Sequence, residues 1–339
     1  MKCDHEHREQ KHPYDKDSFK ERTNMHAISV VVTTYNQPYT GIFHTLDSIV
    51  KQAFEGFEII VADDCSKESP KEVLEEYFSN VGFSDYKIVI NSSNVGTVRN
   101  ILGVHGVADG EFIKVIGAGD MLYSSDTLRK IYEFSRSRKT NFAFGKIKAF
   151  SLEGADITIQ PFNAPLKTEL YITPQNREAI LAQQLIGGDW IPGASLFYRR
   201  DYLEDYLSAL AVDYQVRYCE DLVSPLVAFE DAIDYFDEYI LWYEWGVGIS
   251  NNGSVAARKK MYKDHSNFFS ELSRRYRNNG IVTKAYRRFK VKRFVMLHTP
   301  LYRLLGRFKS AQYLKGQENQ SGDLDSGKAF LLTNLDLKS

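Results

Sequence analysis

The stretch covering residues 28–66, ISVVVTTYNQPYTGIFHTLDSIVKQAFEGFEIIVADDCS, constrains the fold more than any other part of the sequence. Two strand-length runs rich in β-branched residues, 28–32 and 57–62, flank a segment whose apolar residues recur at helical spacing. This pattern predicts a βαβ unit with two parallel, largely buried strands. Polar residues follow both strands, so they should gather at the carboxyl edge of a parallel sheet, where open α/β proteins bind ligands.

Strand-like and helical segments go on alternating over most of the chain. We expect further strands at residues 86–90, 111–116, 141–150, 155–159, 194–198 and 232–245. Helical patterns separate them at 70–80, 94–104, 128–134, 173–187, 202–210 and 220–229. Pro225 must lie in the first turn of the last helix, so that helix can start as late as Ser224. The alternation predicts an α/β fold with a mainly parallel sheet covered by helices on both faces.

Positive charge is concentrated near the C-terminus. The formal net charge of the 339 residues is −1, but residues 272–316 contain 13 Lys and Arg and no acidic residue. Such an asymmetry indicates separate parts with different partners. We expect a flexible N-terminal arm (1–26), a catalytic domain (27–253), a basic helical extension (254–316) and a C-terminal tail (317–339).

The basic extension predicts a partner of opposite charge. Residues 274–309 interleave cations with apolar side chains, a composition that suits a helix lying on an anionic membrane surface. The alternative is a basic face that packs on the catalytic domain. No recognised nucleic-acid-binding module accompanies the charge, so we expect no nucleic-acid partner.

Cysteine usage and hydropathy favour a cytoplasmic protein. The three cysteines, Cys3, Cys65 and Cys219, are widely spaced and form no CxxC pair, which is typical of a reduced compartment. The first 26 residues lack the apolar core of a signal peptide, and no run approaches the roughly 20 apolar residues of a spanning helix. We expect a cytoplasmic protein that attaches peripherally, if at all, to the inner face of the cell membrane.

Five short motifs carry more information together than any one of them does alone. They are VVTTYNQ at 31–37, EIIVADDCS at 58–66, NVGTVRN at 94–100, IGAGD at 116–120 and CED at 219–221. Because it carries these motifs in this order, the chain resembles the family 2 glycosyltransferases, which are inverting enzymes with the GT-A fold. The resemblance is to the members that build bacterial surface polysaccharide. The resemblance covers roughly residues 28–250. It implies transfer of a sugar from a nucleoside diphosphate sugar, with UDP as the expected nucleotide.

The resemblance implies donor contacts at the carboxyl edge of the sheet. The residues concerned are Thr33, Tyr35, Asn36, Asp64, Arg99 and Gly119. Their chemistry suits the task, since the Asp64 carboxylate can accept a hydrogen bond from a uracil N–H or a ribose hydroxyl. The forked donors of Arg99 suit a base carbonyl or diphosphate oxygens. The structural alternatives are that Asp64 caps a turn and that Arg99 is a solvated helix residue.

Asp120 is the implied ligand of a divalent cation, Mg²⁺ or Mn²⁺, that neutralises the leaving diphosphate. It matches the last acid of the family's metal motif, but Gly117, Ala118 and Gly119 stand where a second acid is expected. A single carboxylate can suffice, because Mg²⁺ takes one or two carboxylates together with phosphate oxygens and water. Weaker metal binding, or a variant that needs little metal, therefore stays open.

Asp221 is the candidate general base, by resemblance to the acid at the end of the family's ED step. Glu220 is the other candidate, and both acids could instead stabilise the start of a helix. One base, one departing diphosphate and no obvious second nucleophile favour direct displacement with inversion. Glu220, Trp190 and Trp245 are candidate contacts to the acceptor or to the transferred sugar.

The sequence thus predicts an inverting, metal-dependent glycosyltransferase that moves a sugar to a hydroxyl of a glycan acceptor, lipid-linked, in surface polysaccharide synthesis. The alternative is a glycosyltransferase-like protein that has lost catalysis and serves in binding or assembly, which the single acid in 116–120 supports. A dinucleotide-dependent oxidoreductase is disfavoured, since TTYNQP stands where GxGxxG would follow the first strand.

Overall fold

The computed structural model of the protein describes residues 25–154, 156–160, 164–172, 176–247, 254–298 and 324–335. The N-terminal arm through residue 24 and the first residues of the helix predicted over 173–187 lie outside these ranges. The strands are β1 (His26–Thr34), β2 (Phe57–Asp63), β3 (Tyr86–Ile90), β4 (Gly110–Gly117), β5 (Met121–Leu122), β6 (Phe142–Glu153), β7 (Asp156–Gln160), β8 (Leu196–Arg199) and β9 (Asp234–Glu244). The helices are α1 (Tyr39–Val50), α2 (Lys71–Val81), α3 (Thr97–Val104), α4 (Thr127–Arg138), α5 (Arg177–Ala182), α6 (Arg200–Val212), α7 (Val223–Glu230), α8 (Val255–Arg275), α9 (Gly280–His298) and α11 (Leu324–Asn334).

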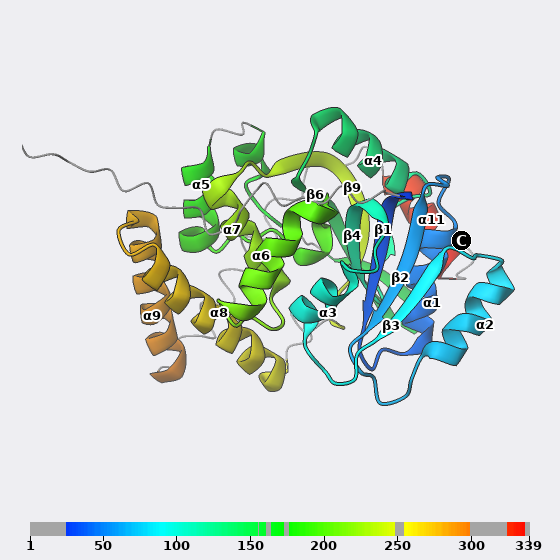
Figure 1. The fold of residues 1–339 in the computed structure, drawn as a ribbon, viewed down its shortest axis with the longest axis horizontal. Helices are drawn as coiled ribbons and strands as arrows, with labels where there is room; N and C mark the ends of the chain where they lie inside the picture. Colours follow the sequence, from blue (N-terminus) through cyan, green and yellow to red (C-terminus); the bar gives the residue numbers. More distant parts are fainter. Residues whose placement is uncertain are drawn as a thin grey trace, which may run out of the picture.

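The strands form one sheet with helices on both faces, as predicted (Figure 1). Its order is β3-β2-β1-β4-β8-β6-β9-β5, with β7 paired to β6. β1 runs parallel to both of its neighbours, β2 and β4, so the βαβ unit predicted for residues 28–66 is confirmed. β8 is antiparallel to β4 and begins beside the end of β4. The segment before β8 therefore reaches the same edge of the sheet as the loops that follow β1, β2 and β4.

Side chains of β1 alternate between two cores, as the period of a strand requires. Val31 packs in the core on the face of α3 and α6, whereas Val30 and Val32 pack in the core on the face of α1, α2 and α4. All three are fully buried. A strand that is buried on both faces reads as a continuous apolar run, which explains the pattern in the sequence.

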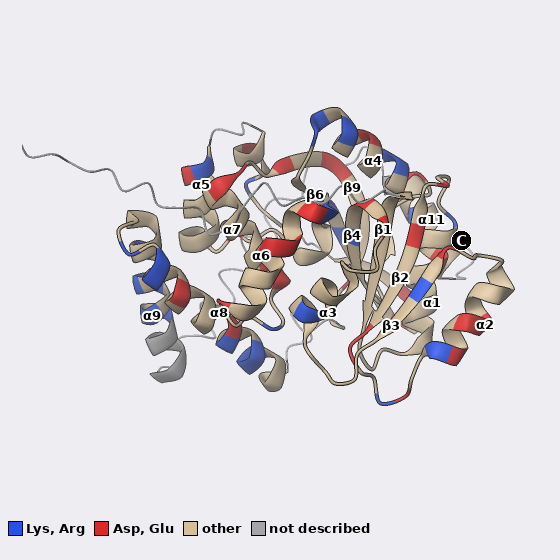
Figure 2. Ribbon diagram, in the orientation of Figure 1, with Lys and Arg blue, Asp and Glu red and all other residues tan. Residues whose placement is uncertain are grey.

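α8 and α9 contribute to the core on the α3 face. Phe268 and Leu272 of α8 are buried in it, together with Val282 and Ala285 of α9. The described helices of the segment predicted as a basic extension, α8 and α9, therefore pack apolar side chains against the rest of the fold. Lys and Arg are spread along the described parts of both helices (Figure 2).

The C-terminal helix α11 covers the β5 end of the sheet. Its Leu331, and Leu335 just beyond it, are buried in a small core with Tyr123 and Trp242. The indole N–H of Trp242 donates to the carbonyl of Gly327 at 3.1 Å. No pattern in the sequence assigns a structure to residues 317–339, and α11 is the part of this tail that the structure describes.

Two helix starts bear on the site. The helix predicted over 94–104 begins at Thr97, because Gly96 has a φ of +87°, which is outside helical geometry. The helix that contains Pro225 begins at Val223, so this proline does lie in the first turn. A 3₁₀ turn precedes it and carries the acidic pair of the CED motif.

Candidate active site

Two loops at the carboxyl edge of the sheet are tied together by hydrogen bonds. Asp63 accepts from the backbone N–H and the hydroxyl of Ser66 at 2.8 and 2.5 Å. The Ser66 hydroxyl oxygen accepts from the Asn36 N–H at 2.7 Å, and Asn36 Oδ1 accepts from the Lys67 N–H at 2.9 Å. Asn36 has a φ of +51°, a left-handed conformation that asparagine adopts more readily than most residues. Its amide oxygen thus orders the loops, and its predicted contact to a donor stays a prediction.

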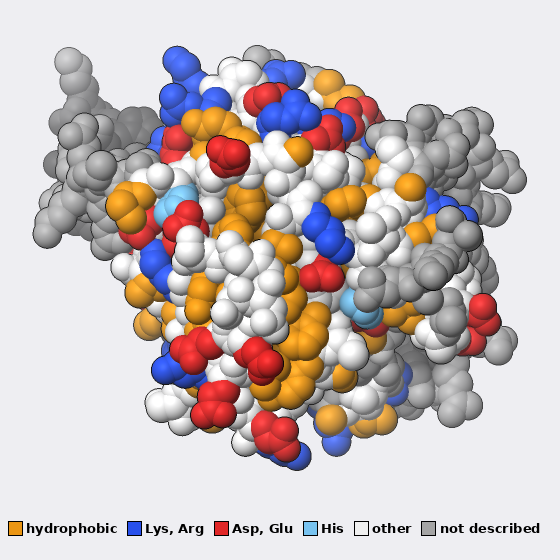
Figure 3. All heavy atoms as spheres, turned by 90° about the vertical axis from the view of Figure 1, so that its right-hand side faces the viewer, with side chains coloured by type: hydrophobic (Ala, Val, Ile, Leu, Met, Phe, Trp, Pro, Cys, Tyr) orange, Lys and Arg blue, Asp and Glu red, His pale blue; other side chains and the backbone are white. Residues whose placement is uncertain are grey.

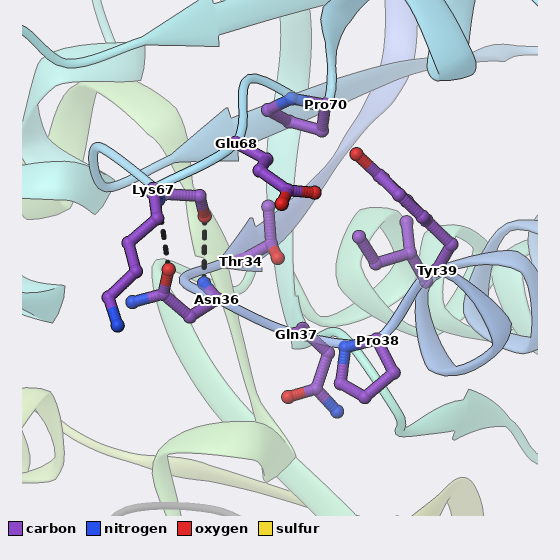
Figure 4. A pocket seen from close by; sticks show the side chains of 10 residues that line it. Thr34, Asn36, Gln37, Pro38, Tyr39, Lys67, Glu68 and Pro70 are labelled. Carbon is purple, nitrogen blue, oxygen red and sulfur yellow. Dashed lines mark hydrogen bonds between the residues drawn. The ribbon is translucent and has the colours of Figure 1, made fainter.

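An open pocket of about 380 Å³ lies between these loops and α1 (Figure 4). Its lining residues are Thr34, Asn36, Gln37, Pro38, Tyr39, Ile42, Ser66, Lys67, Glu68 and Pro70. Ile42 belongs to the core on the α1 face, so the pocket opens on that side of the sheet. Thr33 precedes Thr34 and points to the opposite, α3 side. Tyr35 is exposed beyond the strand.

Asp64 lies on the α3 side and connects the end of β2 to the start of α3. Its carboxylate is 5% exposed and accepts from the backbone N–H groups of Val95 and Gly96 at 2.7 and 2.8 Å. The Asn91 amide approaches the same carboxylate at 3.3 Å. A carboxylate has about four lone-pair sites, so these contacts leave capacity for a ligand hydrogen bond. The nucleoside contact of Asp64 stays a prediction.

Arg217 places a cation at this part of the site, and the sequence reasoning missed it. Its guanidinium donates to the backbone carbonyl of Asn94 and, at 2.7 Å, to the side-chain oxygen of the same residue. A Cβ atom on Gly96 would collide with the Arg217 side chain, so glycine permits this close approach. Arg99, the predicted cation, is exposed and donates to the Ala211 carbonyl at 3.1 Å. The sequence offered one signal for Arg217: it lies three residues before Glu220 and four before Asp221, close to the CED motif.

Asp120 sits in a turn that β1 and α1 hold in place. The Thr33 carbonyl accepts from the Ala118 N–H at 2.9 Å. The Thr45 hydroxyl of α1 donates to the Asp120 carbonyl at 2.7 Å and accepts from the Gly119 N–H at 2.8 Å. Gly119 has a φ of +107°, a conformation that residues with a side chain rarely adopt. The structure thus brings Thr33 and Gly119 next to Asp120.

The Asp120 carboxylate is buried beside a second acid that the motif did not include. Its side chain is 7% exposed, and Oδ1 accepts from the backbone N–H of Glu244 at 2.9 Å. The pKa of Asp120 is raised to about 8, mainly by burial; the hydrogen bond from the Glu244 N–H and the charge of Lys114 oppose the rise, and the charge of Glu244 adds to it. Burial also raises the pKa of Glu244.

Lys114 is a fully buried cation on β4. Its ammonium donates to the carbonyls of Val115, at 3.1 Å, and of Ala194. Leu196 O lies 3.4 Å away. Burial lowers the pKa of Lys114 to about 7, while the charge of Asp120 opposes that change. Lys114 therefore fixes the segment before β8 against the end of β4, near the Asp120 turn.

The acidic pair Glu220 and Asp221 lies in the 3₁₀ turn before α7. A Cβ atom on Gly193 would collide with Glu220 Oε1, so the carboxylate lies against the segment that leads into β8. Burial raises the pKa of Glu220 to about 8, with a further contribution from the charge of Asp221. Burial raises the pKa of Asp221 as well, and His265 lowers it. The candidate base is thus at the carboxyl edge with a neighbour of like charge.

α8 holds the segment that leads into this acidic pair. Asp264 is 3% exposed, and its Oδ2 accepts from the backbone N–H groups of residues 217–219 at 3.1, 2.6 and 3.1 Å. The next residue, His265, has its Nδ1 2.8 Å from the Met261 carbonyl and 3.9 Å from the Cys219 sulfur. Three consecutive N–H groups on one carboxylate fix the backbone there.

The tryptophans differ in position. Trp190 is partly exposed and meets the His265 ring edge to face, with centroids 5.9 Å apart. Trp245 is 39% exposed beyond the end of β9. Trp242 is fully buried and its indole N–H donates to backbone carbonyls, so it belongs to the core. The sugar contacts predicted for Trp190 and Trp245 stay predictions.

The carboxyl edge therefore carries three chemically distinct groups. Asp64 and Arg217 lie at the start of α3, Asp120 and Glu244 at the end of β4, and the acidic pair 220–221 before α7. Within the described ranges no three His, Cys, Asp or Glu side chains come together as a metal site. Such an edge can hold a nucleotide and a cation, and can supply a base.

The family of the protein follows from the sequence match. The model of glycosyl transferase family 2 matches residues 29–207, more than half of the chain. The protein belongs to this family, and the prediction of its GT-A fold is confirmed.

Two relatives are similar in sequence to part of this chain. A poly(ribitol-phosphate) beta-glucosyltransferase of Bacillus spizizenii is 32% identical over 132 residues, 38% of this chain and 20% of the relative. The poly(ribitol-phosphate) beta-N-acetylglucosaminyltransferase TarS of Staphylococcus aureus is 28% identical over 148 residues, 43% of this chain and 25% of TarS. The matched parts thus span a quarter or less of these relatives.

A solved structure of S. aureus TarS, residues 1–349 in complex with UDP-GlcNAc, aligns with 91% of this chain and 89% of that chain. The TM-score is 0.51 and the sequence identity 17%. At this identity the likeness establishes the shared fold alone.

Proposed function

We propose that the protein transfers a sugar from a UDP-sugar to a hydroxyl of a glycan acceptor with inversion at the anomeric carbon. The observation that carries the proposal is the placement of two acidic pairs, Asp120 with Glu244 and Glu220 with Asp221, at the carboxyl edge of a family 2 fold. The first pair suits a cation, and the second suits a base.

The acceptor oxygen bonds to the anomeric carbon as the bond from that carbon to the diphosphate oxygen breaks on the opposite side. Asp221 accepts the proton of the acceptor hydroxyl, and the diphosphate leaves as UDP. Glu220 lies beside this base, where it can contact the acceptor or the sugar. No second nucleophile is required, in keeping with inversion.

The donor is held, in this proposal, by residues at the carboxyl ends of β1 and β2. Asp64 accepts from the nucleoside, with Thr33, Tyr35 and Asn36 nearby, while Arg99 or Arg217 contacts the base or the diphosphate. The TarS structure with UDP-GlcNAc supports a uridine nucleotide, since it has the same fold.

A divalent cation, Mg²⁺ or Mn²⁺, fits the chemistry of the Asp120 turn. Its donor set is carboxylate oxygen, which both ions prefer, and Gly119 lets the Glu244 carboxylate approach the turn where a side chain would otherwise stand. When bound there, the cation would neutralise charge on the leaving diphosphate.

The acceptor is, by our proposal, a surface polymer under assembly on a lipid carrier. Two relatives are named for transfer to poly(ribitol-phosphate), a polymer with free hydroxyls, which supports a polymeric acceptor. Trp190 and Trp245 are then candidate platforms for its sugar or polyol units.

We further propose that the α8–α9 surface brings the protein to the anionic inner face of the cell membrane. None of the described helices has the length and hydropathy to cross a bilayer. The exposed cations of α9 include Lys284, Arg287, Arg288 and Lys290. Tyr286 and Phe289 pack toward the core, so attachment would rest on charge rather than on their insertion. The opposite end of the molecule mixes both signs of charge (Figure 3).

The donor site is tested by calorimetric titration with UDP, ADP, GDP and CDP, with and without Mn²⁺. UDP should bind tightest and should bind more tightly with Mn²⁺. Release of UDP from a panel of UDP-sugars then tests turnover, with Asp221→Asn as the catalytic control. Absence of nucleotide binding under all conditions would refute the proposal.

A further inference from the structure

Strand pairing brings an acid from late in the chain to the Asp120 turn, which lacks a second acid of its own. Met121 pairs with Trp242 and Leu122 with Leu241, in the antiparallel register of β5 and β9. This register places the end of β9 beside the residue before β5. The backbone N–H of Glu244 accordingly donates to Asp120 Oδ1 at 2.9 Å, although the two residues are 124 positions apart.

The Glu244 carboxylate occupies the place of a side chain at residue 119. A Cβ atom on Gly119 would collide with Glu244 Oε2 and would come within 3.5 Å of Glu244 Cδ. The φ of +107° at Gly119 also disfavours any residue other than glycine. An acidic side chain at residue 119 and the Glu244 carboxylate from β9 would therefore occupy the same space, so only one of them can be present.

We propose that Glu244 is the second carboxylate of the divalent-cation site, completing with Asp120 the donor set that the IGAGD motif lacks. The inference rests on the proposed function, because it concerns the cation of that same site. One carboxylate from the turn before β5 and one from the end of β9 would, with diphosphate oxygens and water, supply the oxygen ligands that Mg²⁺ or Mn²⁺ prefers.

The geometry separates the role of the carboxylate from the role of the backbone. The hydrogen bond to Asp120 uses the main-chain N–H of Glu244, which any residue at this position provides. The side chain itself is partly exposed. Glu244→Gln keeps the shape and the backbone bond and removes only the charge, so its effect on cation binding reports on ligation.

The test is Mn²⁺ binding to the whole protein, measured by the electron paramagnetic resonance signal of free Mn²⁺ in the presence of saturating UDP. Glu244→Gln should weaken Mn²⁺ binding at least about tenfold. Asp120→Asn should weaken it as much or more. Glu238→Gln removes the same charge from the exposed middle of β9 and should leave Mn²⁺ binding within about twofold of wild type.

Calorimetry with UDP distinguishes the inference from the proposed function. In Glu244→Gln, UDP affinity should be unchanged without Mn²⁺ and should no longer improve when Mn²⁺ is added. The inference would be overturned if Glu244→Gln bound Mn²⁺ as tightly as the wild type. It would also be overturned if Mn²⁺ did not change the UDP affinity of the wild type. Neither result would contradict the proposed donor site. A wild-type protein that binds no nucleotide would overturn the proposed function itself.

Discussion

Replacing Asp264 by alanine should damage both the stability and the chemistry of the protein. The carboxylate is almost fully buried and accepts three backbone hydrogen bonds, from residues 217, 218 and 219. A hydrogen bond to a charged group contributes about 1.5–3 kcal/mol. The three share one oxygen and are not additive, and part of the freed segment can turn to water. We therefore expect a loss of about 3–4 kcal/mol in the free energy of unfolding.

The same substitution should lower kcat even where the variant is fully folded. Residues 217–219 lead directly into Glu220 and Asp221, so loss of their anchor lets the candidate base move. A displacement of about 1 Å can cost about 100-fold in rate. We expect a fall in kcat of about 10- to 100-fold at a temperature well below the unfolding transition.

Urea unfolding followed by circular dichroism gives the stability change, and UDP release gives kcat. Asp264→Asn, which keeps one acceptor oxygen, should lose roughly half as much stability. Glu271→Gln is the matched control on α8, because this acid accepts from Arg274 and Arg275 of the same helix rather than from residues 217–219, so its loss should leave kcat unchanged. A folded Asp264→Ala enzyme with the kcat of wild type would refute the positioning role.

Three shorter predictions concern the same edge. Gly96→Ala should destabilise the protein by about 2–3 kcal/mol in urea unfolding, since a methyl group there collides with Arg217 and strains a φ of +87°. Arg217→Ala should weaken UDP binding in calorimetry by about tenfold or more, and unchanged affinity would exclude Arg217 from the donor site. The base acts when deprotonated, and burial raises the pKa of Asp221, so kcat/KM should rise with pH through that pKa. A kcat/KM that stays constant over the acidic and neutral pH range would contradict the role of Asp221 as the base.

The first half of the fold could be predicted from sequence because its signals are local. The β-branched runs at 28–32 and 57–62 are buried on both faces, so they read directly as parallel strands. Asp120 comes shortly after β4, and the acids of CED open the 3₁₀ turn before α7, which makes both visible as motifs. The antiparallel pairing of β5 with β9 has no such signal, because β5 is two residues long.

Residues missed by the sequence reasoning act through long-range contacts. Glu244 is the last residue of β9, and its sequence context gives no sign that it faces Asp120. Asp264 lies in a charged helix, where an acid is ordinarily a solvated residue. Lys114 interrupts an apolar strand, and only the carbonyls it meets in the folded chain explain why a cation is tolerated there. The hydrophobic periodicity of the sequence predicts helices and strands, but it does not predict which distant residues these side chains contact.

The family match ends at residue 207, and this boundary separates two sets of side chains in the site. Asp64 and Asp120 lie before it, on the loops that would hold the nucleotide and its cation. The acidic pair 220–221, Glu244 and Asp264 lie after it, and they reach the same edge through β9, α7 and α8. The second set holds the candidate base, its anchor and the second acid beside Asp120. In our proposal Asp64 therefore contacts the nucleotide from before the boundary, while Arg217 and Glu244 reach the donor from beyond it, beside the base. Because Asp264 of α8 anchors both Arg217 and the segment that leads into the base, its loss should lower nucleotide affinity as well as turnover.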